Sequence, residues 1–182
     1  MPANQEATPR TLERMLQADA AISARLVPRW EPLRWLALAV AHSGDSPVWL
    51  LAGAMALFGG DGRWAYVGIR IVVATLAGGV AATLLKFVFR RRRPAGPNRG
   101  LYAKQDLHSF PSGHATRAGC VTAVLLPLLP GWGAVALIGW AIALCLARVA
   151  LQVHYLLDMV GGLAIGGMVG LLLLAVLPYL PV

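Results

Sequence analysis

Charged side chains are scarce in this 182-residue sequence. Only 13% of the residues are Asp, Glu, Lys or Arg, whereas a soluble domain of ordinary composition carries about 25%. In their place, 58% of the residues are hydrophobic and the mean hydropathy is +0.64. A helix crosses a bilayer with about 20 apolar residues, and several runs approach that length. The composition therefore excludes a soluble enzyme and indicates an integral membrane protein with one membrane domain.

Cysteine is also rare. Cys120 and Cys145 are the two in the sequence, both inside apolar runs, so we predict neither a disulfide framework nor a thiolate metal site. Asp, Glu, His and Cys do not cluster at the spacing of metal ligands, and we expect no metal and no other cofactor. The sequence has no internal repeat and no low-complexity tract. Any chemistry is therefore expected to proceed without a cofactor.

Residues 1–34 are expected to form an N-terminal segment ahead of a membrane domain at 35–182. Apolar residues recur at helical spacing over residues 11–27, which predicts an amphipathic helix. Its apolar face comprises Leu12, Met15, Leu16, Ala20, Ile22 and Leu26, and the nearby arginines are Arg10, Arg14, Arg25 and Arg29. Such a helix suits an anionic bilayer surface; a frayed tail with chance periodicity is the alternative. No apolar core follows a basic N-terminus, so we expect no cleavable signal peptide.

The remainder predicts an all-α, polytopic helix bundle with about five membrane spans. The expected spans are residues 48–60, 64–89, 112–129, 131–147 and 154–180. Residues 35–41 are apolar but too short to cross, and the polar break at 42–47 offers Asp45 or Ser46 as a cap for the next helix. Small residues recur every four positions in the last span and favour close helix packing rather than catalysis. These residues are Gly162, Gly166 and Gly170.

Five spans place the N-terminal segment, the loop at 90–110 and the turn at 148–154 on one side of the membrane. Five arginines of the N-terminal segment lie on that side, against Arg63 and Arg70 toward the other. The positive-inside rule then favours the cytoplasm for the first side. One extra or missing span would invert this assignment.

The first polar cluster is Lys86 followed by Arg90-Arg91-Arg92-Arg93-Pro94. Lys86, Arg90 and Arg93 have the spacing of one helix face at the end of a span. Taken alone, such a cluster is typical of a stop-transfer or lipid-headgroup patch, and nothing else in the sequence suggests a nucleic-acid partner. Lys86, however, lies inside the span, where an anchor does not require it.

The second cluster is Pro111-Ser112-Gly113-His114 at the start of a span. The backbone amides of a helix N-terminus bind anions, Gly113 permits close approach of the backbone, and Ser112 adds a hydroxyl donor. Alone, the motif could be a plain helix cap. Arg117, one turn later, is a candidate to contact a second phosphate or a sugar headgroup, with an ion pair to Asp106 as the alternative.

The third cluster is Arg148, His154 and Asp158. Asp158 is the only carboxylate after Leu107 and stands at the mouth of an apolar span, where a charged residue is usually functional. If the helix begins at His154, the two residues stack as i and i+4. The carboxylate can then accept one imidazole N–H and leave the other ring nitrogen as a nucleophile. Of the two histidines, His154 is thus braced by a carboxylate and His114 is not.

Together these residues suit phosphoryl transfer without a metal. Three fixed cations, Lys86, Arg93 and Arg148, would stabilise charge on the phosphoryl oxygens. The clusters resemble the three-part signature of the type 2 phosphatidic-acid phosphatase family, which are membrane lipid phosphatases related to the vanadium haloperoxidases. The matching stretches are Lys86-x6-Arg93-Pro94, Pro111-Ser112-Gly113-His114 and Arg148-x5-His154-x3-Asp158. They span residues 86–158 in the family's order and internal spacing, and the chain length is similar to that of small bacterial members.

The resemblance implies a phosphohistidine mechanism. His154 would attack phosphorus while Asp158 orients it, and His114 would protonate the leaving group and then activate water. The groups expected to hold the phosphate are Lys86, Arg93, Ser112, Gly113 and Arg148, with Arg117 and Arg90 as candidate headgroup contacts. Ala147 stands where the family usually has Ser, so one phosphate hydrogen bond is expected to be absent or replaced, which would weaken or alter substrate binding. Members usually have six spans, which puts the family's outward-facing topology in doubt for a chain with five.

We therefore expect a multi-pass lipid phosphatase of the bacterial cytoplasmic (inner) membrane. Its substrate would be a lipid phosphate or pyrophosphate: polyprenyl pyrophosphate, phosphatidylglycerol phosphate, phosphatidate, phosphorylated lipid A or a polyprenyl-phosphoryl sugar phosphate. One alternative is a phosphotransferase of the same fold that hands the phosphoryl group to an alcohol or sugar. The other is a non-catalytic lipid-headgroup binding or transport protein, which would need the cations but no braced imidazole.

Overall fold

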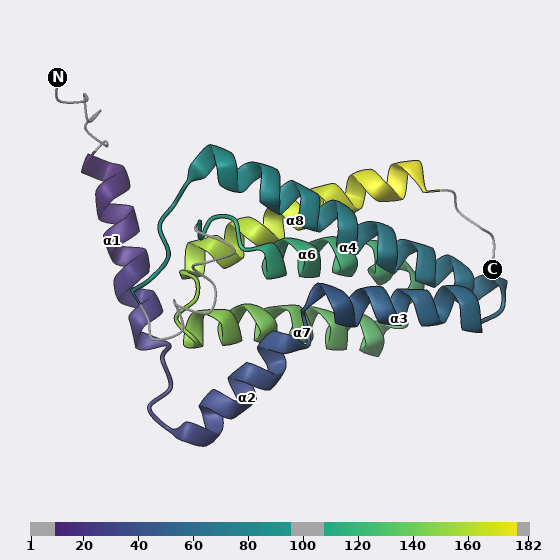
Figure 1. Cartoon of the computed structure of the whole chain (residues 1–182), viewed down its shortest axis with the longest axis horizontal. Helices are drawn as coiled ribbons and strands as arrows, with labels where there is room; N and C mark the ends of the chain where they lie inside the picture. Colours follow the sequence, from purple (N-terminus) through teal and green to yellow (C-terminus); the bar gives the residue numbers. More distant parts are fainter. Residues whose placement is uncertain (1–9, 96–107, 178–182) are drawn as a thin grey trace.

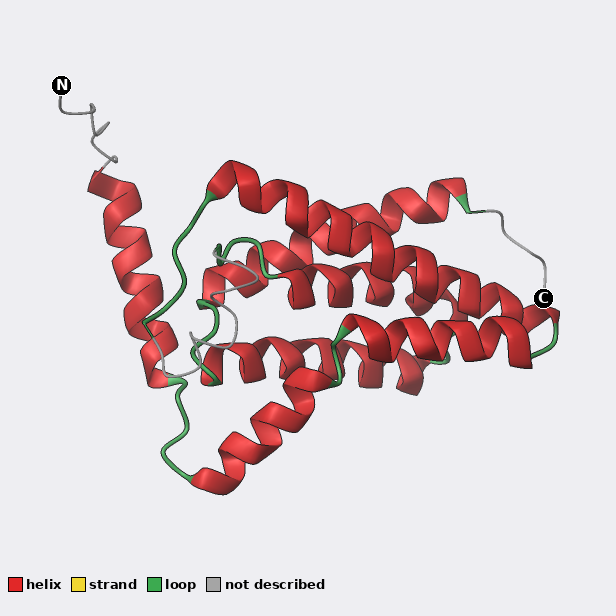
Figure 2. Cartoon of the chain, in the orientation of Figure 1, coloured by secondary structure: helices red, strands yellow, loops and turns green. Residues whose placement is uncertain are grey.

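The computed structural model describes residues 10–95 and 108–177, and helices make up most of this part of the chain (Figures 1 and 2). One β-bridge, between Arg92 and His108, is the single pairing of extended segments within it. In chain order the helices are α1 (Arg10–Arg25), α2 (Glu31–His42), α3 (Ser46–Gly59), α4 (Gly62–Phe89), α6 (Gly113–Leu125), the 3₁₀ turn η1 (Leu126–Leu128), α7 (Gly131–Ala150) and α8 (Leu156–Val176). The all-α prediction is confirmed.

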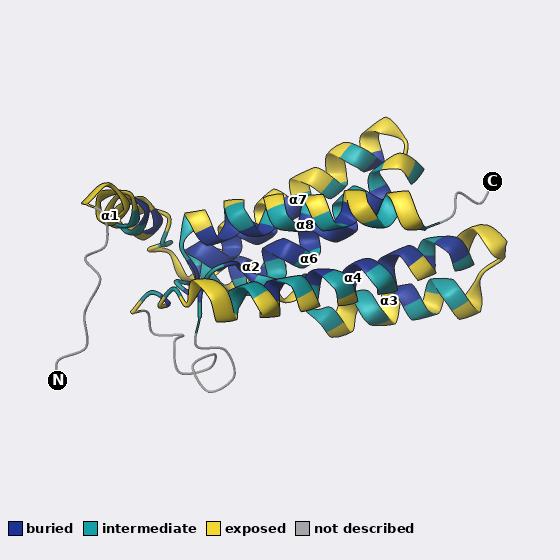
Figure 3. Ribbon diagram, turned by 90° about the horizontal axis from the view of Figure 1, so that it is seen from above, coloured by how far each residue is buried: buried dark blue, intermediate teal, exposed yellow. Residues whose placement is uncertain are grey.

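Three helices are long and apolar enough to cross a membrane: α4 with 28 residues, α7 with 20 and α8 with 21. α3 is apolar but has 14 residues, and α6 continues directly into η1. These helices lie where the five spans were predicted, and the apolar stretch at 35–41 belongs to α2. Exposed residues gather on the outward faces of the bundle and buried ones face inward (Figure 3). The chain is thus a multi-pass membrane protein.

α6 lies at the centre of the bundle, between α8 and α4 (Figure 3). Its contact with α8 is close because glycines of α8 face it. A Cβ at Gly162 would lie 2.7 Å from the Cβ of Ala115, and a Cβ at Gly170 would lie 2.6 Å from the Cβ of Ala123. The predicted packing role of these glycines is confirmed. Close packing fixes the start of α6, which carries His114, relative to the start of α8.

The start of α8 differs from the prediction. The helix begins at Leu156 rather than at His154, with Tyr155 as its N-cap residue. The Asp158 carboxylate accepts the Tyr155 amide at 2.9 Å, and this hydrogen bond fixes the first turn. His154 therefore lies in the turn before the helix, and it meets Asp158 across a helix start instead of stacking with it along a helix face.

The end of α4 also differs. The helix ends at Phe89, because Arg90 adopts a left-handed conformation with φ of 48°. A left-handed residue at this position turns the chain out of the helix. Arg93 is thus on the extended segment that follows, and the prediction that it shares a helix face with Lys86 and Arg90 is wrong.

α1 lies across the end of the bundle at which α4 ends and α8 begins (Figure 1). It occupies nearly the range predicted for the amphipathic helix. Arg70, in contrast, is buried inside the bundle, where its Nη1 donates to the carbonyl oxygen of Val124 at 2.9 Å. That carbonyl belongs to the last turn of α6, whose carbonyls have no partners within the helix. Arg70 therefore caps α6, which explains a charged residue at this depth.

Candidate active site

The three polar clusters meet at one cavity of about 170 Å³. The clusters arrive from the end of α4 and the segment after it, the start of α6, and the end of α7 with the turn that follows. Its polar lining residues are Thr83, Lys86, Arg93, His114, Arg117, Arg148 and His154, and Gly113 of the second cluster also lines it. The sequence prediction thus names most of the lining.

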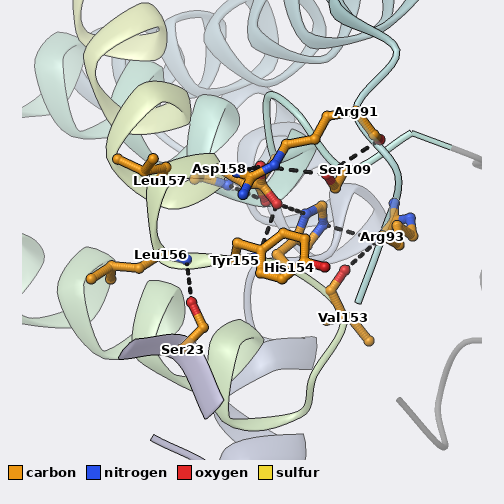
Figure 4. A network of polar contacts seen from close by, with 12 residues as sticks. Ser23, Arg91, Arg93, Ser109, Val153, His154, Tyr155, Leu156, Leu157 and Asp158 are labelled. Atoms are coloured by element: carbon orange, nitrogen blue, oxygen red, sulfur yellow. Dashed lines mark hydrogen bonds and ion pairs between the residues drawn. The ribbon is translucent and has the colours of Figure 1, made fainter. Parts of the chain in front are cut away.

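His154 lies between an acid and a cation. Its Nδ1 is 3.5 Å from Oδ2 of Asp158, and its Nε2 is 3.1 Å from Nη1 of Arg93 (Figure 4). Arg93 is held in place because the same Nη1 donates to the carbonyl oxygen of Val153 at 2.8 Å. The ring is 2% exposed. Nε2 is therefore presented to the cationic side of the cavity while Nδ1 faces the carboxylate, which is the orientation a nucleophilic imidazole requires.

The cavity is strongly cationic. Arg148 is 1% exposed and Arg93 is 8% exposed, so neither charge is well hydrated. At the start of α6, a Cβ added to Gly113 would lie 3.4 Å from Nη1 of Arg117 and 4.0 Å from Nζ of Lys86. The amides of a helix N-terminus and these side chains thus converge on one space. Buried cations are stabilised by an anion among them, so the site suits a phosphate group.

His114 has a carboxylate partner that the sequence analysis did not identify. Its Nε2 is 2.7 Å from Oδ1 of Asp45, and Oδ2 of Asp45 is 2.8 Å from Nδ1 of His42. Burial raises the pKa of Asp45, but the hydrogen bonds and charges of the two histidines outweigh burial, and the pKa lies below its ordinary value. The interpretation that only one imidazole is braced is therefore wrong. Asp45 is 69 residues from His114, so no local pattern connects the two.

Asp45 was considered only as a helix cap. It does occupy the N-cap position of α3, but its side chain makes no capping hydrogen bond. The carboxylate is used by the histidines instead. The signal available in the sequence was an acid within a short polar break between apolar stretches.

Three residues singled out in the sequence, Ser112, Arg90 and Ala147, are not among the residues that line the cavity. Ser112 is fully buried, and its hydroxyl accepts the Ala115 amide at 3.4 Å as the cap of α6. Arg90 is exposed and donates to the carbonyl of Phe87 at 2.9 Å. Ala147 is buried in an apolar cluster with residues of α2 and of the turn after α7. Asp106, the alternative partner of Arg117, lies outside the described residues.

Two further side chains hold Asp158. Arg91 donates from Nη1 to Oδ1 at 2.8 Å, and the Ser109 hydroxyl donates to the same oxygen at 3.4 Å (Figure 4). Asp158 is fully buried, so these donors and the Tyr155 amide replace its hydration. In the sequence Arg91 is one of four consecutive arginines, and nothing there distinguishes it from its neighbours.

A second hollow of about 370 Å³ adjoins the cavity between α3 and α4. Gly79, Thr83 and Arg117 line both spaces. The rest of its lining is largely aliphatic: Ser46, Leu50, Thr75, Leu76, Val80 and Leu84. A polar cavity thus opens beside an apolar groove, with Arg117 at the junction.

The sequence matches the PAP2 superfamily over residues 67–181. Lipid A 1-phosphatase of Rhizobium johnstonii is 31% identical over 87% of this chain and 72% of its own length, and undecaprenyl-diphosphatase of Sulfolobus acidocaldarius is 28% identical over 77% and 68%. The crystal structure of a transmembrane PAP2 type phosphatidylglycerolphosphate phosphatase from Bacillus subtilis superposes with a TM-score of 0.73 at 26% identity, covering 90% of this chain and 86% of that one. LpxE of Aquifex aeolicus shares the fold, with a TM-score of 0.68 at 22% identity over 88% and 94%. The chain therefore belongs to the PAP2 superfamily and is a membrane lipid phosphatase.

Proposed function

We propose that this protein hydrolyses an amphiphilic phosphate or diphosphate ester through a phosphohistidine at His154, without a metal ion. The observation that carries the proposal is the orientation of His154, whose Nε2 faces Arg93 and the cationic cavity while Nδ1 faces Asp158. A cavity for headgroup capture alone would need the cations but not an imidazole held between an acid and a cation.

The reaction has two steps. The lone pair of His154 Nε2 forms a bond to phosphorus while the bond to the leaving oxygen breaks, and that oxygen takes a proton from His114. Water then attacks phosphorus and gives a proton to His114, and the phosphorus–nitrogen bond breaks. Inorganic phosphate is released and both histidines return to their initial states. The surrounding Lys and Arg side chains stabilise the phosphoryl oxygens throughout.

The substrate is a lipid because the groove between α3 and α4 accepts an apolar chain next to the phosphate cavity. Arg117, which lines both spaces, is placed to contact a second anionic group of the headgroup. This favours a diphosphate or a second phosphate over a simple monoester. Two relatives are named as lipid A 1-phosphatase and undecaprenyl-diphosphatase, so a lipid phosphate as substrate agrees with their names.

The test is phosphate release by purified protein from a panel of lipids in the presence of EDTA. The panel comprises polyprenyl diphosphate, phosphorylated lipid A, a polyprenyl-phosphoryl sugar phosphate, phosphatidylglycerol phosphate and phosphatidate. We expect activity that EDTA leaves unchanged and a labelled enzyme that retains phosphate through alkali and loses it in acid. Loss of activity in EDTA would contradict the metal-free scheme. Transfer of the phosphate to an added alcohol in preference to water would identify a phosphotransferase instead.

The active-site end faces the cytoplasm of a bacterial cell in this proposal, because the arginines of the N-terminal segment lie at that end. Arg63 begins α4 at the opposite end, so the variant Arg63→Cys should react with a membrane-impermeant thiol reagent added outside the cell. Both native cysteines are buried and give a low background. Labelling only after the membrane is opened would reverse the orientation.

A further inference from the structure

α1 turns an unexpected face toward the rest of the protein. Asp19 and Ser23, one turn apart, are only 5% and 6% exposed. Apolar residues of the same helix are exposed, among them Met15 and Ile22. An amphipathic helix that simply rested on a bilayer would have no reason to bury an acid and a hydroxyl. The buried polar residues therefore indicate a specific contact made by α1.

That contact is with the start of α8. The amide of Leu156 donates to the Ser23 hydroxyl at 2.9 Å (Figure 4). The amide of Leu157 donates to Oδ1 of Asp19 at 3.0 Å. The first amides of a helix have no acceptors within it, and the N-cap residue Tyr155 has no short side chain to serve them. α1 thus supplies the cap of α8 from more than 130 residues away.

The carboxylate of Asp19 also reaches Asp158, through an arginine. Nη2 of Arg91 donates to Oδ2 of Asp19 at 2.6 Å, and Nη1 donates to Oδ1 of Asp158 at 2.8 Å. The guanidinium also lies over the ring of Tyr155, 4.3 Å from its centroid. Arg91 is therefore fixed on three sides, and its hydrogen bond to Oδ1 leaves Oδ2 of Asp158 directed toward His154.

We propose that α1 is a positioning element of the active site, in which Asp19 acts through Arg91 to hold Asp158 in the orientation that aligns His154. The inference rests on the proposed function, because it takes His154 to be the nucleophile. Arg91 is not one of the residues of the three-part signature, and α1 precedes the matched region altogether. α1 and His154 are thus linked through a chain of contacts that runs from Asp19 through Arg91 and Asp158.

The decisive variant is Asp19→Asn. The amide oxygen of Asn still accepts the Leu157 N–H, so the cap of α8 is kept, but an NH₂ group replaces the oxygen that faces Arg91. We expect kcat to fall about tenfold with KM changed less than about twofold, since loss of a group that orients a functional histidine costs roughly 10- to 100-fold. Asp19→Glu should recover much of the loss. The matched control is Glu13→Gln, an exposed acid on the same helix, which should behave as wild type.

A double-mutant cycle separates positioning from folding. Arg91→Gln should lower kcat by itself, and adding Asp19→Asn to it should cost less than about a further twofold if Asp19 acts through Arg91. Ser23→Ala, which removes only a cap, should lower the thermal midpoint in detergent and leave kcat near wild type. An unchanged kcat in Asp19→Asn, or full additivity with Arg91→Gln, overturns the inference. Asp19→Asn can fail in this way while His154→Ala remains inactive, whereas an active His154→Ala would refute the proposed function itself.

Discussion

The two histidines of the cavity each face a carboxylate, but the two pairs meet water differently. The side chains of His154 and Asp158 are 1% and 0% exposed, whereas those of His114 and Asp45 are 14% and 34% exposed. Asp45 also contacts His42, whose side chain is 61% exposed. One pair is sealed inside the protein, and the other is connected to the solvent through a second imidazole.

This difference fits the two tasks of a phosphohistidine mechanism. A nucleophile exchanges no proton with the solvent, so burial protects its lone pair and strengthens the field of its carboxylate. The general acid gives a proton to the leaving group and takes one from the attacking water, so its pair has to lie where water can reach it, and Asp45 is partly exposed. The comparison indicates that the carboxylates are not equivalent: Asp158 lies against a buried ring, while Asp45 lies against a ring that water can reach.

Substitutions in the buried pair, His154 and Asp158, should lower activity more than substitutions in the pair of His114 and Asp45. We expect His154→Ala to lower kcat by about 10⁴-fold or more, as loss of a nucleophile does, and Asp158→Asn to lower it roughly 10³- to 10⁴-fold. Both losses should be accompanied by loss of trapped phosphoenzyme. Arg34→Gln is a suitable control, because it breaks an exposed ion pair on α2 without touching either histidine of the cavity. Comparable phosphoenzyme levels in His154→Ala would assign the nucleophile elsewhere.

The effect of substituting His114, in the solvent-connected pair, should depend on the leaving group of the substrate. His114→Ala should lower kcat for a lipid alkyl phosphate by about 10² to 10⁴-fold, since an alkoxide must be protonated as it departs. An aryl phosphate with an acidic phenol as leaving group needs no such proton. We therefore expect phosphoenzyme formation from p-nitrophenyl phosphate to be slowed much less, measured as a burst of nitrophenol in rapid mixing. Equal losses with both substrates would show that His114 only binds phosphate.

The solvent connection of Asp45 can be read from its pH dependence. The pKa of Asp45 lies below its ordinary value despite burial. His114 and His42 form hydrogen bonds with the carboxylate and interact favourably with its negative charge, and both effects lower the pKa. A lowered folded pKa means that the stabilisation is complete above the ordinary carboxylate pKa and is lost as the pH falls through the lowered value. His42→Ala removes one of these contacts and should move that loss to higher pH, seen in the thermal midpoint below about pH 4.

Asp45→Asn should remove this pH dependence and lower kcat about tenfold, less than Asp158→Asn does. Arg34→Gln, which breaks an exposed ion pair on α2, is the control. If the acid limb of His42→Ala coincides with that of the wild type, the second imidazole does not act on Asp45.

Sequence reasoning found the sealed pair and missed the connected one for a physical reason. His154 and Asp158 are four residues apart, and a charged residue at the mouth of an apolar run is conspicuous by its cost. Asp45 meets His114, and Asp19 meets Arg91, only through tertiary packing that no periodicity encodes. The helices could be placed because apolar length determines them, but the ends near His154 and Arg90 are set by individual cap residues. The glycines of α8 were assigned correctly because their spacing itself is the packing motif.

The smallest expected effect concerns Ala147, which lies next to Arg148 of the cavity lining in sequence. The resemblance to the family predicts that the missing serine hydroxyl weakens phosphate binding, so Ala147→Ser should improve KM. In the structure Ala147 packs in a cluster with Ala37 and Ala41 of α2 and is 6% exposed. A hydroxyl there would be buried among methyl groups at a cost of about 1 kcal/mol. We expect kcat/KM of Ala147→Ser to stay within about twofold of wild type while the thermal midpoint falls, and Ala147→Gly serves as the control for lost packing. A several-fold lower KM with unchanged stability would show that the serine side chain turns toward the phosphate, and that the end of α7 can rotate away from α2 when substrate binds.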